Sequence, residues 1–248
     1  MFPENIMIRH PLILCSIALA TQAPAAVLVD INADGTNRNA TTAHFETAAG
    51  LSAGTFSGDS ITYFPNNNPG GGSYSPTVDN ITINISNIDN DADNWFGGGS
   101  DNNLLDDGIF HYTNGTETLT LSGSGLGLSA NTTYELYLFA GRNVSFSGGH
   151  DTTFTFNVSD PENFAGGTSI NTDGPVVGGD ETLGTAMFTF TTGVSAPSSL
   201  QIGWSGLGAD PNAAVLSGFA LRTIPEPSSA LLAILGLTGL ITLRRRTS

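Results

Sequence analysis

The sequence predicts an all-β protein: a single antiparallel β-sandwich, jelly-roll-like, flanked by an apolar segment at each end. Three observations predict this fold class. Short runs rich in threonine, isoleucine and aromatic residues alternate apolar with polar positions, as a strand with one solvated face requires. Clusters of glycine, asparagine, aspartate and proline separate these runs and mark turns. No part of the body keeps a helical period over three turns.

The predicted strands succeed one another along residues 27–223, which we expect to form one domain. Nine runs carry the pattern: 27–31, 55–64, 81–85, 118–121, 133–139, 153–158, 186–191, 200–204 and 215–221. The run 133–139 is the most apolar, so we expect it to be a central strand of a sheet. Trp204 lies within an apolar alternation and is predicted to belong to the core.

Charge and composition exclude several classes of function. The 248 residues include seven arginines, no lysine and 22 acidic residues, for a formal net charge of −15. A chain without lysine cannot use a Schiff-base or phosphate-loop lysine. A strongly acidic chain is a poor partner for nucleic acid. The single cysteine, Cys15, lies in the N-terminal apolar segment, so the body has no thiol for catalysis, disulfides or metal binding.

Residues 1–26 are predicted to be a secretory signal peptide. Arg9 and His10 end the short N-terminal region of the signal, and the apolar run 12–20 that follows is too short to span a bilayer. Ala23, Pro24 and Ala25 then supply the small residues that a signal peptidase needs, which places cleavage near residue 25 or 26. The remaining body, 27–223, has twenty acidic residues and three arginines, a formal charge of −17.

The C-terminal segment, 224–248, has three parts in a fixed order. They are the triplet Pro225, Glu226 and Pro227, the apolar run 228–243, and the cluster Arg244, Arg245 and Arg246. The prolines prevent the preceding strand from continuing. The apolar run predicts a short transmembrane helix of about 24 Å, and the three arginines that follow it predict a cytoplasmic end that anchors the helix.

This order of parts resembles the PEP-CTERM sorting signal of Gram-negative bacteria. The resemblance covers the last 25 residues, and it implies that an exosortase recognises Pro225, Glu226 and Pro227, processes the chain and sorts it to the cell surface or extracellular matrix. Proteins of this family are commonly tied to exopolysaccharide and biofilm. Two patterns in the body are similar to exported bacterial sandwich domains: a Gly-Leu-x-x-x-x-x-Tyr turn at 127–134 and a closing strand at 216–221.

Two groups of acidic residues are candidate calcium sites, although the sequence predicts no cofactor. Asp89, Asp91 and Asp93 stand at alternate positions, where a divalent cation would relieve their repulsion, but a solvated loop relieves it too, and more often. The segment 30–35 matches the opening of an EF-hand loop, yet position twelve is Thr41 rather than a bidentate carboxylate. A strand that ends in an Asp-Gly turn explains that segment as well.

The sequence offers no convergent catalytic site. The histidines of the body, His44, His111 and His150, lack metal-ligand spacing, and Glu117 and Glu135 read as outward-facing strand residues or as a glycosidase pair. The leading prediction is therefore a non-enzymatic structural or adhesion-type protein of the envelope or matrix, with an exosortase as its partner and a membrane contact before processing. The alternative is a carbohydrate-binding module for exopolysaccharide, with Trp95 as its candidate ligand platform beside the glycines at 97–99.

Overall fold

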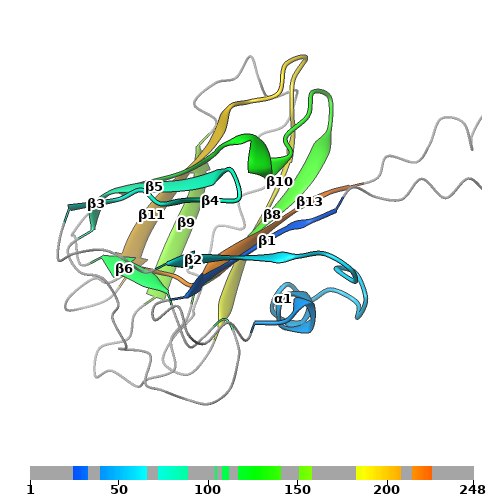
Figure 1. Cartoon of the computed structure of the whole chain (residues 1–248). Helices are drawn as coiled ribbons and strands as arrows, with labels where there is room; N and C mark the ends of the chain where they lie inside the picture. The colour runs from blue at the N-terminus through cyan, green and yellow to red at the C-terminus, as the bar shows by residue number, and fades with distance from the viewer. Residues whose placement is uncertain are drawn as a thin grey trace, which may run out of the picture.

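The computed structural model describes residues 25–32, 40–65, 72–88, 104, 108–111, 117–140, 151–157, 183–207 and 214–224. These residues form two large sheets, drawn in Figure 1. The five-stranded sheet has the order β10 (Gly184–Thr191), β8 (Thr133–Ala140), β13 (Gly218–Thr223), β1 (Val27–Asn32) and β2 (Ile61–Pro65). The six-stranded sheet has the order β3 (Gly72–Tyr74), β5 (Ile81–Ile88), β7 (Glu117–Ser122), β11 (Ser199–Leu207) and β9 (Asp151–Asn157), with β4 (Thr77–Val78) paired to β5.

Four short elements complete the described chain. Strands β6 (Ile109–His111) and β12 (Ala214–Leu216) form a separate two-stranded sheet. Helix α1 (Thr42–Ala48) lies beside the five-stranded sheet, and the 3₁₀ helix η1 (Ser124–Leu126) joins β7 to the turn before β8. None of the helices in these described ranges is long and apolar enough to cross a membrane.

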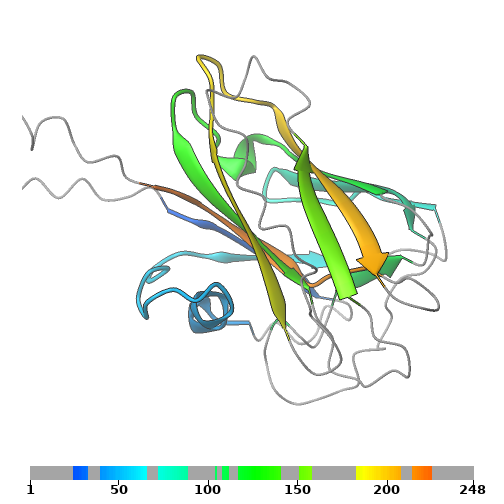
Figure 2. The same cartoon turned by 180° about the vertical axis from the view of Figure 1, so that it is seen from behind.

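The main core lies between the two large sheets. This packing of one sheet on another confirms the predicted all-β fold class. Alternate residues of each strand face it, as in β7, where Leu119 and Leu121 are buried and their neighbours are not. Trp204 on β11 is fully buried in this core, as predicted. Phe156 of β9 stacks on Phe188 and Phe190 of β10 at ring distances of 5.7 and 5.1 Å, which ties the sheets together. Figure 2 shows β9 and β11 side by side from behind.

A second, smaller core covers the opposite face of the five-stranded sheet. Phe45 of α1 meets Phe139 of β8 edge-to-face at 5.6 Å, and Phe56 and Tyr137 are buried in the same cluster. Strand β8 is therefore apolar on both faces, since Leu136 faces the main core. This two-sided burial explains why 133–139 is the most apolar run, and it confirms that β8 is an interior strand.

The structure corrects four details of the predicted strands. Strand β2 begins only at Ile61, because 53–58 forms turns. The run 215–221 divides into β12 and β13 at Ser217. Strands β1 and β2 pair in parallel, so the sandwich is not purely antiparallel. Helix α1 was not predicted, because its seven residues give only two turns and fall short of a readable helical period.

A buried carboxylate holds the segment between α1 and β2. Glu46 is only 5% exposed, and its two carboxylate oxygens accept the N–H groups of Gly54 at 2.9 Å and Phe56 at 2.7 Å. Two hydrogen bonds to backbone N–H groups replace the water that this carboxylate loses on burial. The turns after α1 are thereby fastened to the helix, and Phe56 is held in the second core.

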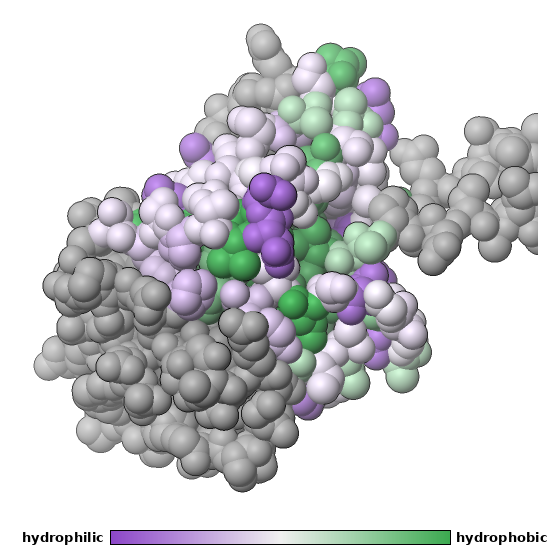
Figure 3. All heavy atoms as spheres, in the orientation of Figure 1, coloured by the Kyte–Doolittle hydropathy of each residue, from purple (hydrophilic) through white to green (hydrophobic). Residues whose placement is uncertain are grey.

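The described surface shows no broad apolar area on the face seen in Figure 3. Green patches there are small and stand among pale and purple residues. Within the described ranges, the exposed large hydrophobic side chains are Met187, 37% exposed, and Val194, 84% exposed. Single exposed apolar side chains of this kind do not mark a docking face.

Candidate functional site

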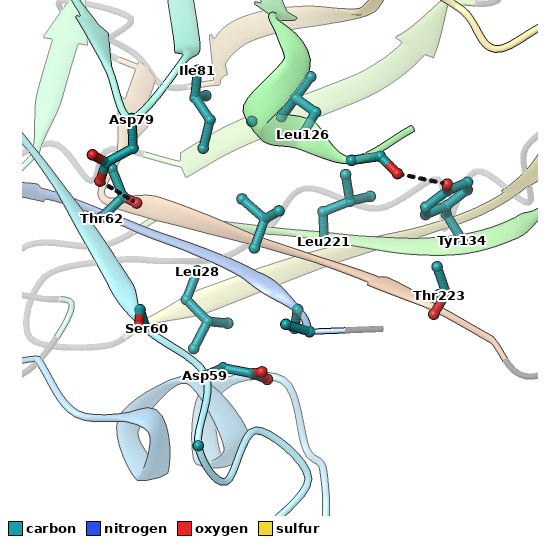
Figure 4. Close-up of a pocket in the computed structure, with 16 residues that line it drawn as sticks. Leu28, Asp59, Ser60, Thr62, Asp79, Ile81, Leu126, Tyr134, Leu221 and Thr223 are labelled. Carbon is teal, nitrogen blue, oxygen red and sulfur yellow. Dashed lines mark hydrogen bonds between the residues drawn. The ribbon is translucent and has the colours of Figure 1, made fainter. Parts of the chain in front are cut away.

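A pocket of about 360 Å³ opens at the end of the sandwich where β1 and β2 begin and β13 ends (Figure 4). Its walls come from both large sheets, from the β4–β5 turn and from η1. The lining combines aliphatic side chains with carboxyl and hydroxyl groups. The labelled members are Leu28, Asp59, Ser60, Thr62, Asp79, Ile81, Leu126, Tyr134, Leu221 and Thr223.

The upper wall of the pocket depends on a close approach between two backbones. Asp79 and Asn80 form the two-residue turn between β4 and β5, with φ values of 49° and 61°, as the tight hairpin requires. The N–H of Gly125 in η1 donates a hydrogen bond of 3.0 Å to the carbonyl of Asn80. Thr62 of β2 donates a hydrogen bond of 3.1 Å to Asp79, which links the two sheets across the pocket.

Tyr134 closes the far wall and explains the Gly-Leu-x-x-x-x-x-Tyr pattern. Its hydroxyl donates to the carbonyl of Gly127 at 3.1 Å and accepts the N–H of Ser129 at 2.7 Å. The tyrosine thus clamps the turn that precedes its own strand, as the tyrosine corner of other β-sandwiches does. Its ring stacks on Phe190 at 5.4 Å. The spacing in the sequence therefore encodes a turn clamp rather than a ligand contact.

Two carboxyl groups line the pocket, and none of the described residues lining it is basic. Asp59 lies two residues before the start of β2, and partial burial raises the pKa of its carboxyl group. A backbone hydrogen bond from Ala26 opposes that rise in pKa. Asp79 lies on the opposite wall, where it accepts the hydroxyl of Thr62. The pocket is therefore a weakly acidic site that suits a cationic group or a hydrogen-bond donor.

The two glutamates considered as a glycosidase pair do not converge. Glu117 is on β7 of the six-stranded sheet, whereas Glu135 is on β8 and faces away from the other sheet. Arg222 of β13 contacts Glu135 at 2.6 Å through Nε and at 2.5 Å through a terminal nitrogen. The hydroxyl of Tyr137 also donates a hydrogen bond to Glu135. Burial is the larger cause and this hydrogen bond the next, and together they raise the pKa of Tyr137 to about 12. Glu135 thus belongs to an ion pair on the outer face.

Other residues singled out in the sequence have structural positions. Asp30 is buried within β1 and paired in register with Gly218 and Tyr63, so the start of the proposed EF-hand loop is a strand. His44 accepts the N–H of Thr41 at 3.1 Å and caps the start of α1. Among the described residues, no group of three or more histidine, cysteine or acidic side chains comes together.

The remaining predicted site residues lie outside the described residues. They are Pro225, Glu226 and Pro227, Arg244, Arg245 and Arg246, Trp95, and Asp89, Asp91 and Asp93. The predicted signal peptide lies there up to residue 24, and so does the predicted helix 228–243.

The chain enters and leaves the body at the pocket end. Val27 of β1 pairs with Leu221 of β13, so the first and last strands are antiparallel neighbours. The two strands begin and end on the same side of the molecule in Figure 1. Beyond β13, the N–H of Ile224 donates a hydrogen bond of 2.8 Å to the carbonyl of Thr133. Folded structure thus reaches the residue directly before Pro225.

Sequence reasoning missed the carboxyl groups of the pocket. The Asp79-Asn80 pair between two alternating runs is a readable hairpin signal, since both residues tolerate positive φ. Asp59 has no such signal, because only the parallel pairing of β1 with β2 brings it to the start of β1. No family model, no curated protein and no solved structure matches this chain.

Proposed function

We propose that this chain is an exported, non-enzymatic structural or adhesion-type protein that an exosortase sorts to the cell surface or extracellular matrix. The order of the C-terminal parts carries the proposal: a Pro-Glu-Pro triplet, one apolar run and an arginine cluster. In this role the β-sandwich is the delivered domain, and the triplet is the recognition site of another enzyme. The acidic body, with a formal charge of −17, favours solubility outside the cell.

The position of the last sheet hydrogen bond supports this proposal. The N–H of Ile224 is the final described donor to the sheet, and Pro225 has no N–H to extend the pairing. The triplet therefore begins directly after the last residue that the structure describes. Cleavage after this point removes no described strand, so the sandwich can survive release intact.

Replacing Pro225, Glu226 and Pro227 together with alanine is expected to leave most of the protein in the inner membrane of a host that has an exosortase. The reason is that the apolar run and the arginines remain while the recognition site is lost. The measurement is immunoblotting of membrane and released fractions. The matched control replaces Ser228 and Ser229 with alanine and is expected to be released like the wild type. Equal release of the triplet variant would contradict the assignment.

A carbohydrate-binding module is the second candidate, and one sequence observation favours it. Trp95 stands between Asn94 and Phe96, and three glycines follow Phe96, a context that suits an aromatic platform for a sugar ring. Under this candidate the processed protein is retained on an exopolysaccharide column, and Trp95→Ala abolishes retention. Val194→Ala, at an 84% exposed apolar position, serves as the control and should be retained. A wild-type protein that binds no polysaccharide on an array would remove the candidate.

A further inference from the structure

The parallel pairing of β1 with β2 places the starts of both strands side by side. Leu28 pairs with Ile61, so the same register continued backwards by two residues sets Ala26 opposite Asp59. Both residues line the pocket, and a backbone hydrogen bond from Ala26 lowers the pKa of the Asp59 carboxyl group against the rise that burial causes. In Figure 4, Asp59 lies beneath the start of β1 at the mouth of the pocket.

Asp59 is held in this position independently of Ala26. Its own N–H donates to the carbonyl of Phe56 at 3.1 Å, and the side chain of Phe56 is 1% exposed within the second core. Glu46 in turn holds the N–H of Phe56 at 2.7 Å. A buried aromatic ring, two hydrogen bonds and the start of β2 therefore fix the backbone that carries Asp59 before any ligand arrives.

The charges around Asp59 leave it without a cationic partner among the described pocket residues. The other titratable groups of the lining are Asp79, which accepts the hydroxyl of Thr62, and Tyr134, whose hydroxyl clamps its turn. The nearest strand beyond β1 carries Arg222, but its guanidinium is paired with Glu135. On the side of α1, the carboxylate of Glu46 is occupied by two backbone N–H groups. A positive charge at the nitrogen of Ala26 would therefore meet a preformed, unneutralised acceptor.

Signal-peptide cleavage after Ala25 would create that charge. We propose that Asp59 is the binding site for the α-ammonium group of a mature N-terminus at Ala26, and that removal of the signal peptide completes the site. The inference rests on the proposed export. The described pairing of β1 begins at Val27, so cleavage here removes no sheet hydrogen bond. It converts a neutral N–H donor into a cationic one, so the hydrogen bond to the Asp59 carboxylate gains the attraction of an ion pair.

The sign of the resulting pH dependence is fixed. A carboxylate partner raises the pKa of the α-ammonium group above its ordinary value of about 7.7–8.0. The pair therefore stabilises the folded protein below about pH 8, and this stabilisation is lost as the pH rises through the raised pKa. It is also lost in acid, once Asp59 is protonated. Neutral conditions are where the pair contributes most.

The absence of lysine makes this site directly measurable, because the α-amino group is the only primary amine that the chain contains. The full chain is expressed with its signal peptide and purified after processing, and its N-terminus is sequenced. The rate of acylation by an amine-reactive ester is then followed by mass spectrometry between pH 6 and 10. Only the unprotonated amine reacts, so the midpoint of the rate profile gives the pKa. The variants are Asp59→Asn, which keeps the shape of the side chain, and Asp79→Asn as the control on the opposite wall.

The expected result is an N-terminus at Ala26 and acylation at pH 7.5 about tenfold slower in wild type than in Asp59→Asn, equivalent to one pKa unit. Asp79→Asn should react like the wild type. Equal midpoints for wild type and Asp59→Asn would overturn the inference and leave export standing. An N-terminus at another processed position would do the same. A chain that keeps Met1 would defeat the proposed export and this inference together. Melting curves of both variants at neutral pH establish that each one is folded.

Discussion

Gly123→Ala is expected to lower the free energy of unfolding by about 3–5 kcal/mol, because alanine fails there for two independent reasons. Gly123 has a φ of +105°, a backbone conformation that L-residues with a Cβ rarely adopt. A Cβ atom at this position would also lie 2.1 Å from the carbonyl oxygen of Asn80. That oxygen belongs to the backbone of a tight turn and cannot rotate away. Denaturant unfolding followed by circular dichroism measures the loss.

Two neighbouring glycines separate these causes. Gly127 has a φ of +63° but open space around it, so Gly127→Ala tests backbone strain alone and should cost about 1–2 kcal/mol. Gly125 has no positive φ, but its added Cβ would lie 2.4 Å from the carbonyl oxygen of Asp79, so Gly125→Ala tests the close approach and should cost about 2–3 kcal/mol. A loss at Gly123 no larger than that at Gly127 would contradict the packing of η1 on the β4–β5 turn.

Trp204→Ala is expected to cost about 3–5 kcal/mol of unfolding free energy, through lost burial and the cavity left behind. Trp204 is fully buried in the main core, on a strand that pairs with β7 on one side and β9 on the other. Neither neighbour can move inward to fill the space without breaking its register. The measurement is again denaturant unfolding, read from backbone circular dichroism because the variant loses a fluorescent residue.

Val194→Ala is the matched control for this core substitution. Val194 is 84% exposed, so its truncation should change the free energy of unfolding by no more than about 0.5 kcal/mol. A Trp204 variant as stable as the Val194 variant would mean that the two large sheets do not enclose Trp204 as described.

Local alternation predicted most of the fold, because a strand with one buried and one solvated face alternates apolar and polar residues along its own sequence. The runs around Ile83, Leu119 and Trp204 were predicted for this reason, and each is a strand with alternate side chains in the core. The second core was not predictable in the same way. Its members come from α1, β8 and the turns after α1, and no single segment shows the pattern that they form together.

The candidate site also depends on contacts between segments that are distant in sequence, and these contacts could not be predicted from local patterns. The Tyr134 clamp joins residues only seven positions apart, so its spacing was visible in the sequence, although its role as a turn clamp was not. The contact between Ala26 and Asp59 depends on a parallel pairing of β1 with β2, and nothing in either segment specifies that partner. The proposed sorting triplet is the opposite case, since its information lies wholly in local sequence.

Because the first strand of the body pairs with the last one, the five-stranded sheet forms late in folding. Strand β1 needs β13 beside it, with Val27 opposite Leu221, and β13 also separates β1 from β8. The five-stranded sheet therefore cannot close until nearly the whole body has been synthesised, and contacts so distant in sequence form slowly. For a chain that is threaded across a membrane as proposed, this delay is useful: the polypeptide stays extended during passage and folds once its final strand has emerged on the far side.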